Sequence, residues 1–72
     1  MTNWTQVIQD LSRTNVEEFA NGRLSGENLY ELALQTGSLE TRSTIRNLLR
    51  TRRVNETRQL ARKALSRRLR LS

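Results

Sequence analysis

Apolar residues recur along the chain at the spacing of an α-helix, and no run alternates apolar and polar residues as a half-buried strand does. The first apolar stripe occupies positions i, i+3, i+4 and i+7 of one helix and consists of Trp4, Val7, Ile8 and Leu11. Thr2 or Asn3 precedes this stripe and is expected to cap the helix. The pattern therefore predicts an all-α protein.

Two further helices are bounded by residues that favour helix ends. Thr14 and Glu17 have the spacing of a capping box, so we expect the second helix to begin at Thr14. The Asn21-Gly22 pair should end it, because both residues tolerate a left-handed backbone. Ser25 is expected to cap a third helix that Gly37 ends. The inward faces of these helices are predicted to be Val16, Phe19 and Ala20, and then Leu29, Leu32 and Ala33.

The basic end of the chain is predicted to form a fourth and a fifth helix. Ser38 should cap the fourth, whose inward residues are Ile45, Leu48 and Leu49. A break near Val54–Asn55, with Asn55 as the next cap, is expected because the apolar stripe changes phase there. The apolar residues of the fifth helix spread over a wide arc that Arg58 and Arg68 interrupt: Leu60, Ala61, Ala64, Leu65, Leu69 and Leu71. This helix is expected either to dock against a second copy or to become ordered with a partner.

The expected architecture is a compact bundle of four to five short helices in one small domain covering residues 1–72. A chain of this length buries a small core, and with no cysteine it has no disulfide to reinforce it, so a homo-oligomer is a reasonable expectation. The N-terminus does not resemble a signal peptide, and no apolar run is long enough to span a membrane. We therefore expect a cytoplasmic protein.

Charge divides the chain into two halves. Residues 1–40 contain two basic and six acidic residues, a net charge of −4, whereas residues 41–72 contain eleven basic residues and one acidic residue, a net charge of +10. Twelve of the thirteen basic residues are arginine, whose planar fork suits phosphate or carboxylate groups. The basic half cannot be neutralised by the acidic half, so a positive surface is expected to remain for a partner.

Catalysis is not expected from this composition. The chain contains no histidine base and no cysteine nucleophile, and its carboxylates fall at predicted caps and first turns rather than in pairs. The three glycines are too far apart to form a phosphate-binding loop. We expect a non-enzymatic protein with no cofactor and no metal site.

The candidate site is instead an arginine ridge on the last two helices. Arg42, Arg46 and Arg50 stand at i, i+4 and i+8, which places them on one helix face beside the apolar stripe. Instead of binding a partner, the arginines could pair with the acidic helices of the same chain. Even full pairing of this kind would leave a net positive ridge. The full set of predicted nucleic-acid-binding residues is Arg42, Arg46, Arg50, Arg52, Arg53, Arg58, Arg62, Lys63, Arg67, Arg68 and Arg70.

The stretch from Leu29 to Leu48 resembles a helix-turn-helix motif. Ala33 suits a close helix crossing, Gly37 suits the turn, and Ile45 faces the core of the second helix, although the turn is about two residues longer than in a standard motif. In this resemblance Arg50, Arg52 and Arg53 would contact phosphates. The residues expected to reach base edges are Thr41, Arg42, Thr44 and Arg46.

Duplex DNA is the favoured partner, because the basic half has no aromatic residue on which single-stranded bases could stack. The sequence therefore predicts a small DNA-binding regulatory protein. The main alternative is an adaptor or inhibitor that binds an acidic protein surface, with Tyr30, Leu65 and Leu69 as apolar anchors. An anionic membrane surface is a third possibility, and self-association of the acidic half with the basic half of another copy is a fourth.

Overall fold

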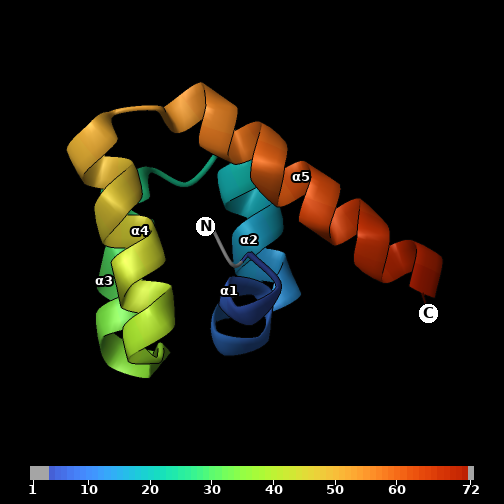
Figure 1. The fold of residues 1–72 in the computed structure, drawn as a ribbon, viewed down its shortest axis with the longest axis horizontal. Coiled ribbons are helices and arrows are strands. Elements are labelled where there is room, and N and C mark those ends of the chain that lie inside the picture. The colour runs from blue at the N-terminus through green and yellow to red at the C-terminus, as the bar shows by residue number, and fades with distance from the viewer. Residues whose placement is uncertain (1–3, 72) are drawn as a thin grey trace.

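Five α-helices follow one another in the computed structural model, which describes the backbone of residues 4–71 and the side chains of residues 4–67 (Figure 1). They are α1 (Trp4–Leu11), α2 (Arg13–Ala20), α3 (Gly26–Thr36), α4 (Leu39–Thr51) and α5 (Val54–Leu71). No strand occurs between residues 4 and 71, so the all-α prediction is confirmed. The expected cap at Thr2 or Asn3 lies outside the described residues.

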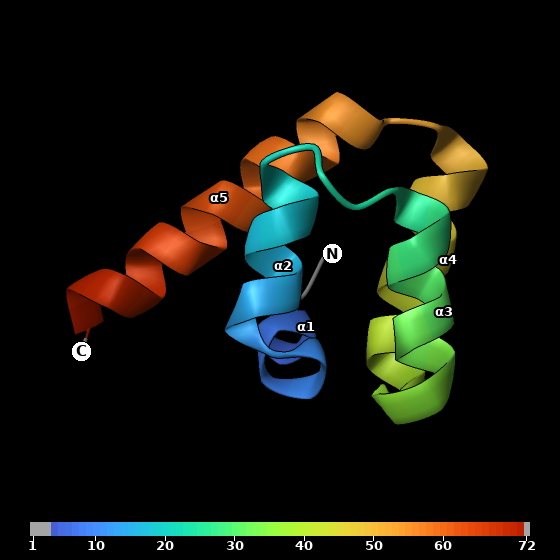
Figure 2. The ribbon, with the colours of Figure 1, turned by 180° about the vertical axis from the view of Figure 1, so that it is seen from behind.

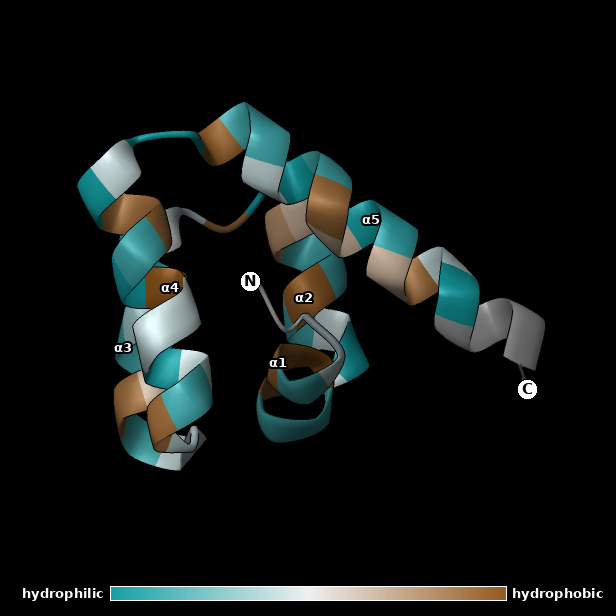
Figure 3. Ribbon diagram, in the orientation of Figure 1, coloured by the Kyte–Doolittle hydropathy of each residue, from teal (hydrophilic) through white to brown (hydrophobic). Residues whose placement is uncertain are grey.

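The helices surround one core. In Figures 1 and 2 the α3–α4 pair lies on one side, α1 and α2 lie in the centre, and α5 crosses the top of the molecule. The short helix α1 packs against all four other helices. The radius of gyration is 10.8 Å, close to the value of about 11 Å expected for a folded chain of this length. Figure 3 shows hydrophobic residues interspersed among hydrophilic ones along the helices.

The core agrees with most of the predicted stripes. All four residues of the first stripe are buried, as are Val16, Phe19, Ala20, Leu29, Ala33, Ile45 and Leu48. Leu32 and Leu49, which were also expected inside, are half-buried at the edge. Trp4 stacks on Phe19, with the ring centroids 5.7 Å apart and the planes 8° from parallel. Such a pair adds about 0.5–1.5 kcal/mol to the gain from burial.

The start of α2 differs from the prediction. Its cap is Ser12, whose hydroxyl accepts a hydrogen bond from the backbone N–H of Asn15, and the capping box at Thr14 does not form. Ser12 is the single residue between α1 and α2, and its positive φ of 76° turns the chain sharply. Glu17 pairs instead with Arg13, at 2.7 Å. The end of α2 at Asn21-Gly22 is as predicted, with Gly22 at a φ of 82°.

The α3–α4 segment forms an antiparallel hairpin instead of a helix-turn-helix motif. The caps Ser25 and Ser38 and the end at Gly37 are as predicted. The two helices lie side by side along their length, whereas the helices of the motif cross steeply (Figures 1 and 2). The connection is so tight that a Cβ on Gly37 would come within 2.8 Å of the carbonyl oxygen of Ala33, which favours glycine at this position. The resemblance to a helix-turn-helix motif is therefore wrong for this chain.

The chain breaks between α4 and α5, one or two residues before the predicted position. Arg52 ends α4 in the left-handed conformation, with a φ of 58°, and α5 begins at Val54. Asn55 is not a cap and lies exposed in the first turn of α5. Among the side chains of α5 that the structure describes, Thr57, Ala61 and Leu65 are buried. Leu60, one of the apolar residues of the predicted wide arc, is 45% exposed.

A single carboxylate ties α1 to the start of α4. One oxygen of Asp10 accepts hydrogen bonds from the Thr41 hydroxyl at 2.6 Å, the Ser38 hydroxyl at 2.8 Å and the Ser38 backbone N–H at 2.9 Å. The other oxygen accepts a hydrogen bond from the Gln6 amide, at 2.9 Å. These bonds, led by the one from Thr41, hold the pKa of Asp10 well below its usual range.

The Asp10 contacts predict a loss of stability in acid. Because the pKa of Asp10 is lowered by folding, its contribution is complete above the unfolded-state pKa of about 3.9 and falls as the pH drops below it. We expect Asp10→Asn to lower the free energy of unfolding at pH 7 and to make stability less dependent on pH between about 5 and 2. Urea denaturation followed by circular dichroism measures both effects.

The matched control is Glu31→Gln, which also removes one carboxylate, from an exposed position on α3. It should leave stability at neutral pH nearly unchanged. If the two variants had the same stability and the same acid profile, the contacts of Asp10 would not contribute to the fold.

Candidate nucleic-acid interface

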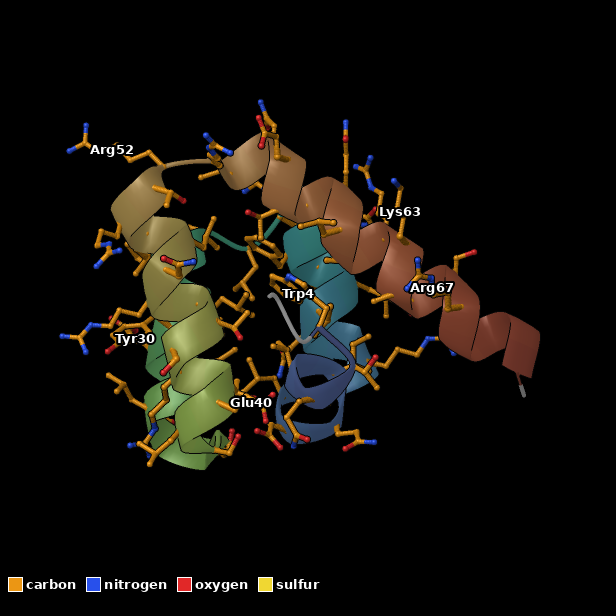
Figure 4. All side chains as sticks on the ribbon, in the orientation of Figure 1. Trp4, Tyr30, Glu40, Arg52, Lys63 and Arg67 are labelled. Carbon is orange, nitrogen blue, oxygen red and sulfur yellow. The ribbon has the colours of Figure 1, made fainter. Side chains whose placement is uncertain are left out.

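Seven of the described basic side chains of α4, α5 and the corner between them are exposed, and one of these, Arg53, pairs with Glu56. We call the other six the cationic set: Arg46, Arg50, Arg52, Arg62, Lys63 and Arg67. Figure 4 shows Arg52 projecting from the corner, away from the bundle, and Lys63 projecting from the side of α5 that faces away from α1 and α2. Arg68 and Arg70, which the sequence also suggested, have side chains outside the described part of the structure.

The cationic set is not neutralised within the described part of the chain. Its six charged groups form no hydrogen bond and no ion pair with other described side chains. The ion pairs that do form are local ones, Arg13–Glu17, Arg23–Glu18 and Arg53–Glu56, at 2.7, 3.3 and 3.7 Å. Packing of the acidic helices against the arginines, the alternative that the sequence left open, is thus not observed for these six residues.

Arg42 does not belong to this exposed set, although the sequence placed it in the ridge. Its guanidinium donates from Nε to the Ala33 carbonyl at 3.2 Å and from Nη2 to the Leu34 carbonyl at 3.1 Å. These carbonyls lie in the last turn of α3, where the helix end carries partial negative charge, and the Ala33 oxygen also accepts the backbone N–H of Gly37. Arg42 therefore closes the α3–α4 hairpin and is a structural residue.

Arg58 likewise bonds backbone carbonyls, here at the end of α2 and in the segment that follows it. It donates from Nε to the Phe19 carbonyl at 2.9 Å and from Nη2 to the Leu24 carbonyl at 3.4 Å. Its Cζ also lies 5.3 Å from the centroid of the Phe19 ring, within the range of a cation–π contact. In the conformation described, the guanidinium of Arg58 is turned toward the bundle, and its place in the nucleic-acid-binding surface stays a prediction.

The residues expected to reach base edges from α4 are mostly unavailable. Thr41 is fully buried and bonded to Asp10, so it cannot contact a base. Thr44 is half-buried and lines a groove of about 500 Å³ between α4 and α5. Since Arg42 is held by α3, only Arg46 of the four is exposed without a partner among the described side chains.

The outer face of α5 contains polar residues that the sequence analysis missed. Asn55, Gln59 and Ser66 are exposed, and they share this face with Arg62 and Lys63. The outer face can be identified from the buried residues Thr57 and Ala61. Gln59 lies two positions from each of them, and residues two positions apart point to roughly opposite sides of a helix.

Aromatic residues contribute little to the exposed surface. Trp4 and Phe19 are buried, and Tyr30 is half-buried on α3, as the sequence predicted. The described residues contain no cluster of acidic, cysteine or histidine side chains that could hold a metal ion. None of the helices described combines the length and the apolar composition that crossing a bilayer requires.

Comparisons of the chain with protein-family models, with curated proteins and with solved structures find no match. The site must therefore be interpreted from its own chemistry.

Proposed function

We propose that this protein is a small, non-enzymatic regulatory protein that binds duplex DNA through the cationic set on α4 and α5. The observation that supports this proposal most directly is the absence of ion pairs for all six side chains within the described part of the chain. Exposed arginines of like charge on one helix repel one another, so a surface of this kind gains stability when phosphates neutralise it.

The physical basis of the proposed binding is the release of counterions from DNA. Each cation that contacts a phosphate displaces condensed counterions, so the logarithm of the binding constant falls linearly with the logarithm of the salt concentration. The described aromatic residues are buried or half-buried, which does not favour binding of single strands by base stacking. Binding through phosphates alone would hold many sequences with similar affinity.

The test is a titration of labelled DNA with the purified protein. We expect duplex DNA of random sequence to bind with a dissociation constant in the micromolar range or below at near-physiological salt. The affinity should fall steeply with salt, with a logarithmic slope of about −4 to −6 if most of the cationic set contacts phosphates. Fluorescence anisotropy at several salt concentrations measures both values, and single-stranded DNA and RNA should bind more weakly. No duplex binding near physiological salt would refute the proposal.

A second candidate is an adaptor that binds an acidic protein surface, and two exposed leucines favour it. Leu39 is 78% exposed and Leu34 is 48% exposed, and they lie on either side of the α3–α4 turn. Of the anchors expected from sequence, Leu65 is buried, Tyr30 is half-buried, and the side chain of Leu69 lies outside the described residues. A double Leu34→Ser/Leu39→Ser variant that binds duplex DNA normally but loses a protein partner would support this function.

A further inference from the structure

The outer face of α5 combines side chains that can read bases with side chains that can contact phosphates. Gln59, Arg62, Lys63 and Ser66 stand at positions i, i+3, i+4 and i+7, and all four are exposed. Glutamine and arginine form paired hydrogen bonds with adenine and guanine in the major groove, and a serine hydroxyl bonds to several base edges. On the basis of the proposed function, we propose that α5 is the helix that enters the major groove of duplex DNA.

The position of α5 allows this approach. The helix runs along the outer edge of the bundle, and its C-terminal part extends past α1 and α2 in both views (Figures 1 and 2). An α-helix is about 10–12 Å wide with its side chains, which matches a major groove of about 12 Å. Figure 4 shows Lys63 on the outward side of α5, Arg52 at the corner before it and Arg67 farther along the helix. With α5 in the groove, Arg52 and Arg67 would lie toward the phosphates on its borders.

The other basic helix, α4, is less suited to a groove. Its arginine face adjoins α3, which packs along α4 and carries exposed Glu27 and Glu31. Insertion of α4 would bring these carboxylates toward phosphates, and like charges repel. On α5 the single acidic residue is Glu56, which lies in the first turn and is paired with Arg53. The contacts of α4 are therefore assigned to the DNA backbone and those of α5 to the bases.

The chemistry also separates DNA from RNA. The major groove of an RNA duplex is deep and narrow, so side chains on a helix do not reach its bases. Binding through α5 in the groove should then favour a DNA duplex over an RNA duplex of the same sequence and charge.

The experiment compares two duplexes of equal charge with the full-length protein. In one, glucosylated 5-hydroxymethylcytosine replaces cytosine and fills the major groove, and the other is unmodified. We expect the modified duplex to bind at least about tenfold more weakly, because each paired contact with a base is worth about tenfold to a hundredfold. The second arm uses Gln59→Ala/Arg62→Lys, which keeps the net charge of +6 and removes both paired contacts. This variant should bind the unmodified duplex about tenfold or more less tightly, with an unchanged salt slope.

The control variant is Arg23→Lys/Gln35→Ala, which makes the same two changes at exposed positions outside the cationic set, one just before α3 and one within it. It should retain wild-type affinity and wild-type sensitivity to the filled groove. If wild-type protein binds both duplexes equally, or if the α5 variant behaves like the control, α5 does not enter the groove, although salt-dependent duplex binding would leave the proposed function intact. Absence of duplex binding by wild-type protein would overturn both.

Discussion

Replacing Arg46 and Arg50 by glutamate is expected to weaken duplex DNA binding by at least about a hundredfold at moderate salt. Both side chains are exposed on α4 and have no ion pair among the described residues, so their charges are available to phosphates. The substitution removes two phosphate contacts and adds two repulsive charges, and it should reduce the magnitude of the salt slope by about 2. Anisotropy titrations of the same labelled duplex measure both changes.

The chain offers a matched control for the effect of net charge. Arg13→Glu/Arg23→Glu changes the net charge by the same amount, from +6 to +2, and both arginines are exposed on the acidic half. These residues pair locally with Glu17 and Glu18, and we expect their replacement to weaken binding far less. If the two double variants lost affinity equally, binding would depend on overall charge alone, and the cationic set would not be the site.

Arg42 is left out of this variant because the structure makes it a structural residue. Its bonds to the Ala33 and Leu34 carbonyls close the hairpin, so an Arg42→Glu change would disturb the fold and confuse a loss of binding with a loss of structure. The regular spacing of Arg42, Arg46 and Arg50 in the sequence does not show that Arg42 is structural while the other two are exposed. Arg42 differs because the start of α4 lies beside the C-terminal end of α3, whereas the later turns of α4 do not.

Helix positions and the main core stripes could be predicted from the sequence because they depend on local signals. The caps Ser25 and Ser38 and the stripe that begins at Trp4 follow from helical spacing and from the hydrogen bonds that short polar side chains offer a helix end. The cap of α2 was predicted two residues too late, at Thr14 instead of Ser12, although both are residue types that cap helices. The turn after Leu11 decides between them, and it requires a positive φ at Ser12.

Tertiary contacts account for the features that the sequence did not reveal. Thr41 looks like a surface residue of a basic helix, but the carboxylate of Asp10, distant in sequence, bonds its hydroxyl and allows it to be buried. Leu60 looks like a core residue, yet α5 rotates so that the smaller Thr57 and Ala61 face α1 and α2. Small side chains allow close helix packing, and this rotation turns Gln59 and Ser66 outward.

Arg58→Met is expected to lower the free energy of unfolding by about 2–3 kcal/mol. Methionine keeps much of the apolar stem, but the Phe19 and Leu24 carbonyls lose the guanidinium as a donor and the Phe19 ring loses its cation. The Phe19 carbonyl retains its bond from the Gly22 backbone N–H. A 72-residue chain has a total stability of about 4–11 kcal/mol, so the change removes a large share of it. Arg58→Lys should also destabilise, since an ammonium group cannot form both bonds in the same geometry. Urea denaturation followed by circular dichroism gives the values.

The comparison that decides the role of Arg58 is Arg62→Met, one turn farther along α5. Arg62 is exposed and has no partner among the described side chains, so its loss should change stability by less than about 0.5 kcal/mol. Duplex DNA binding should show the reverse order, with Arg62→Met weakened and folded Arg58→Met close to wild type. Equal stability of the two variants, combined with an equal loss of DNA binding, would show that Arg58 contacts phosphate and that its bonds to α2 are dispensable. The opposite orders in the two measurements separate an arginine that holds the fold from an arginine that binds the partner.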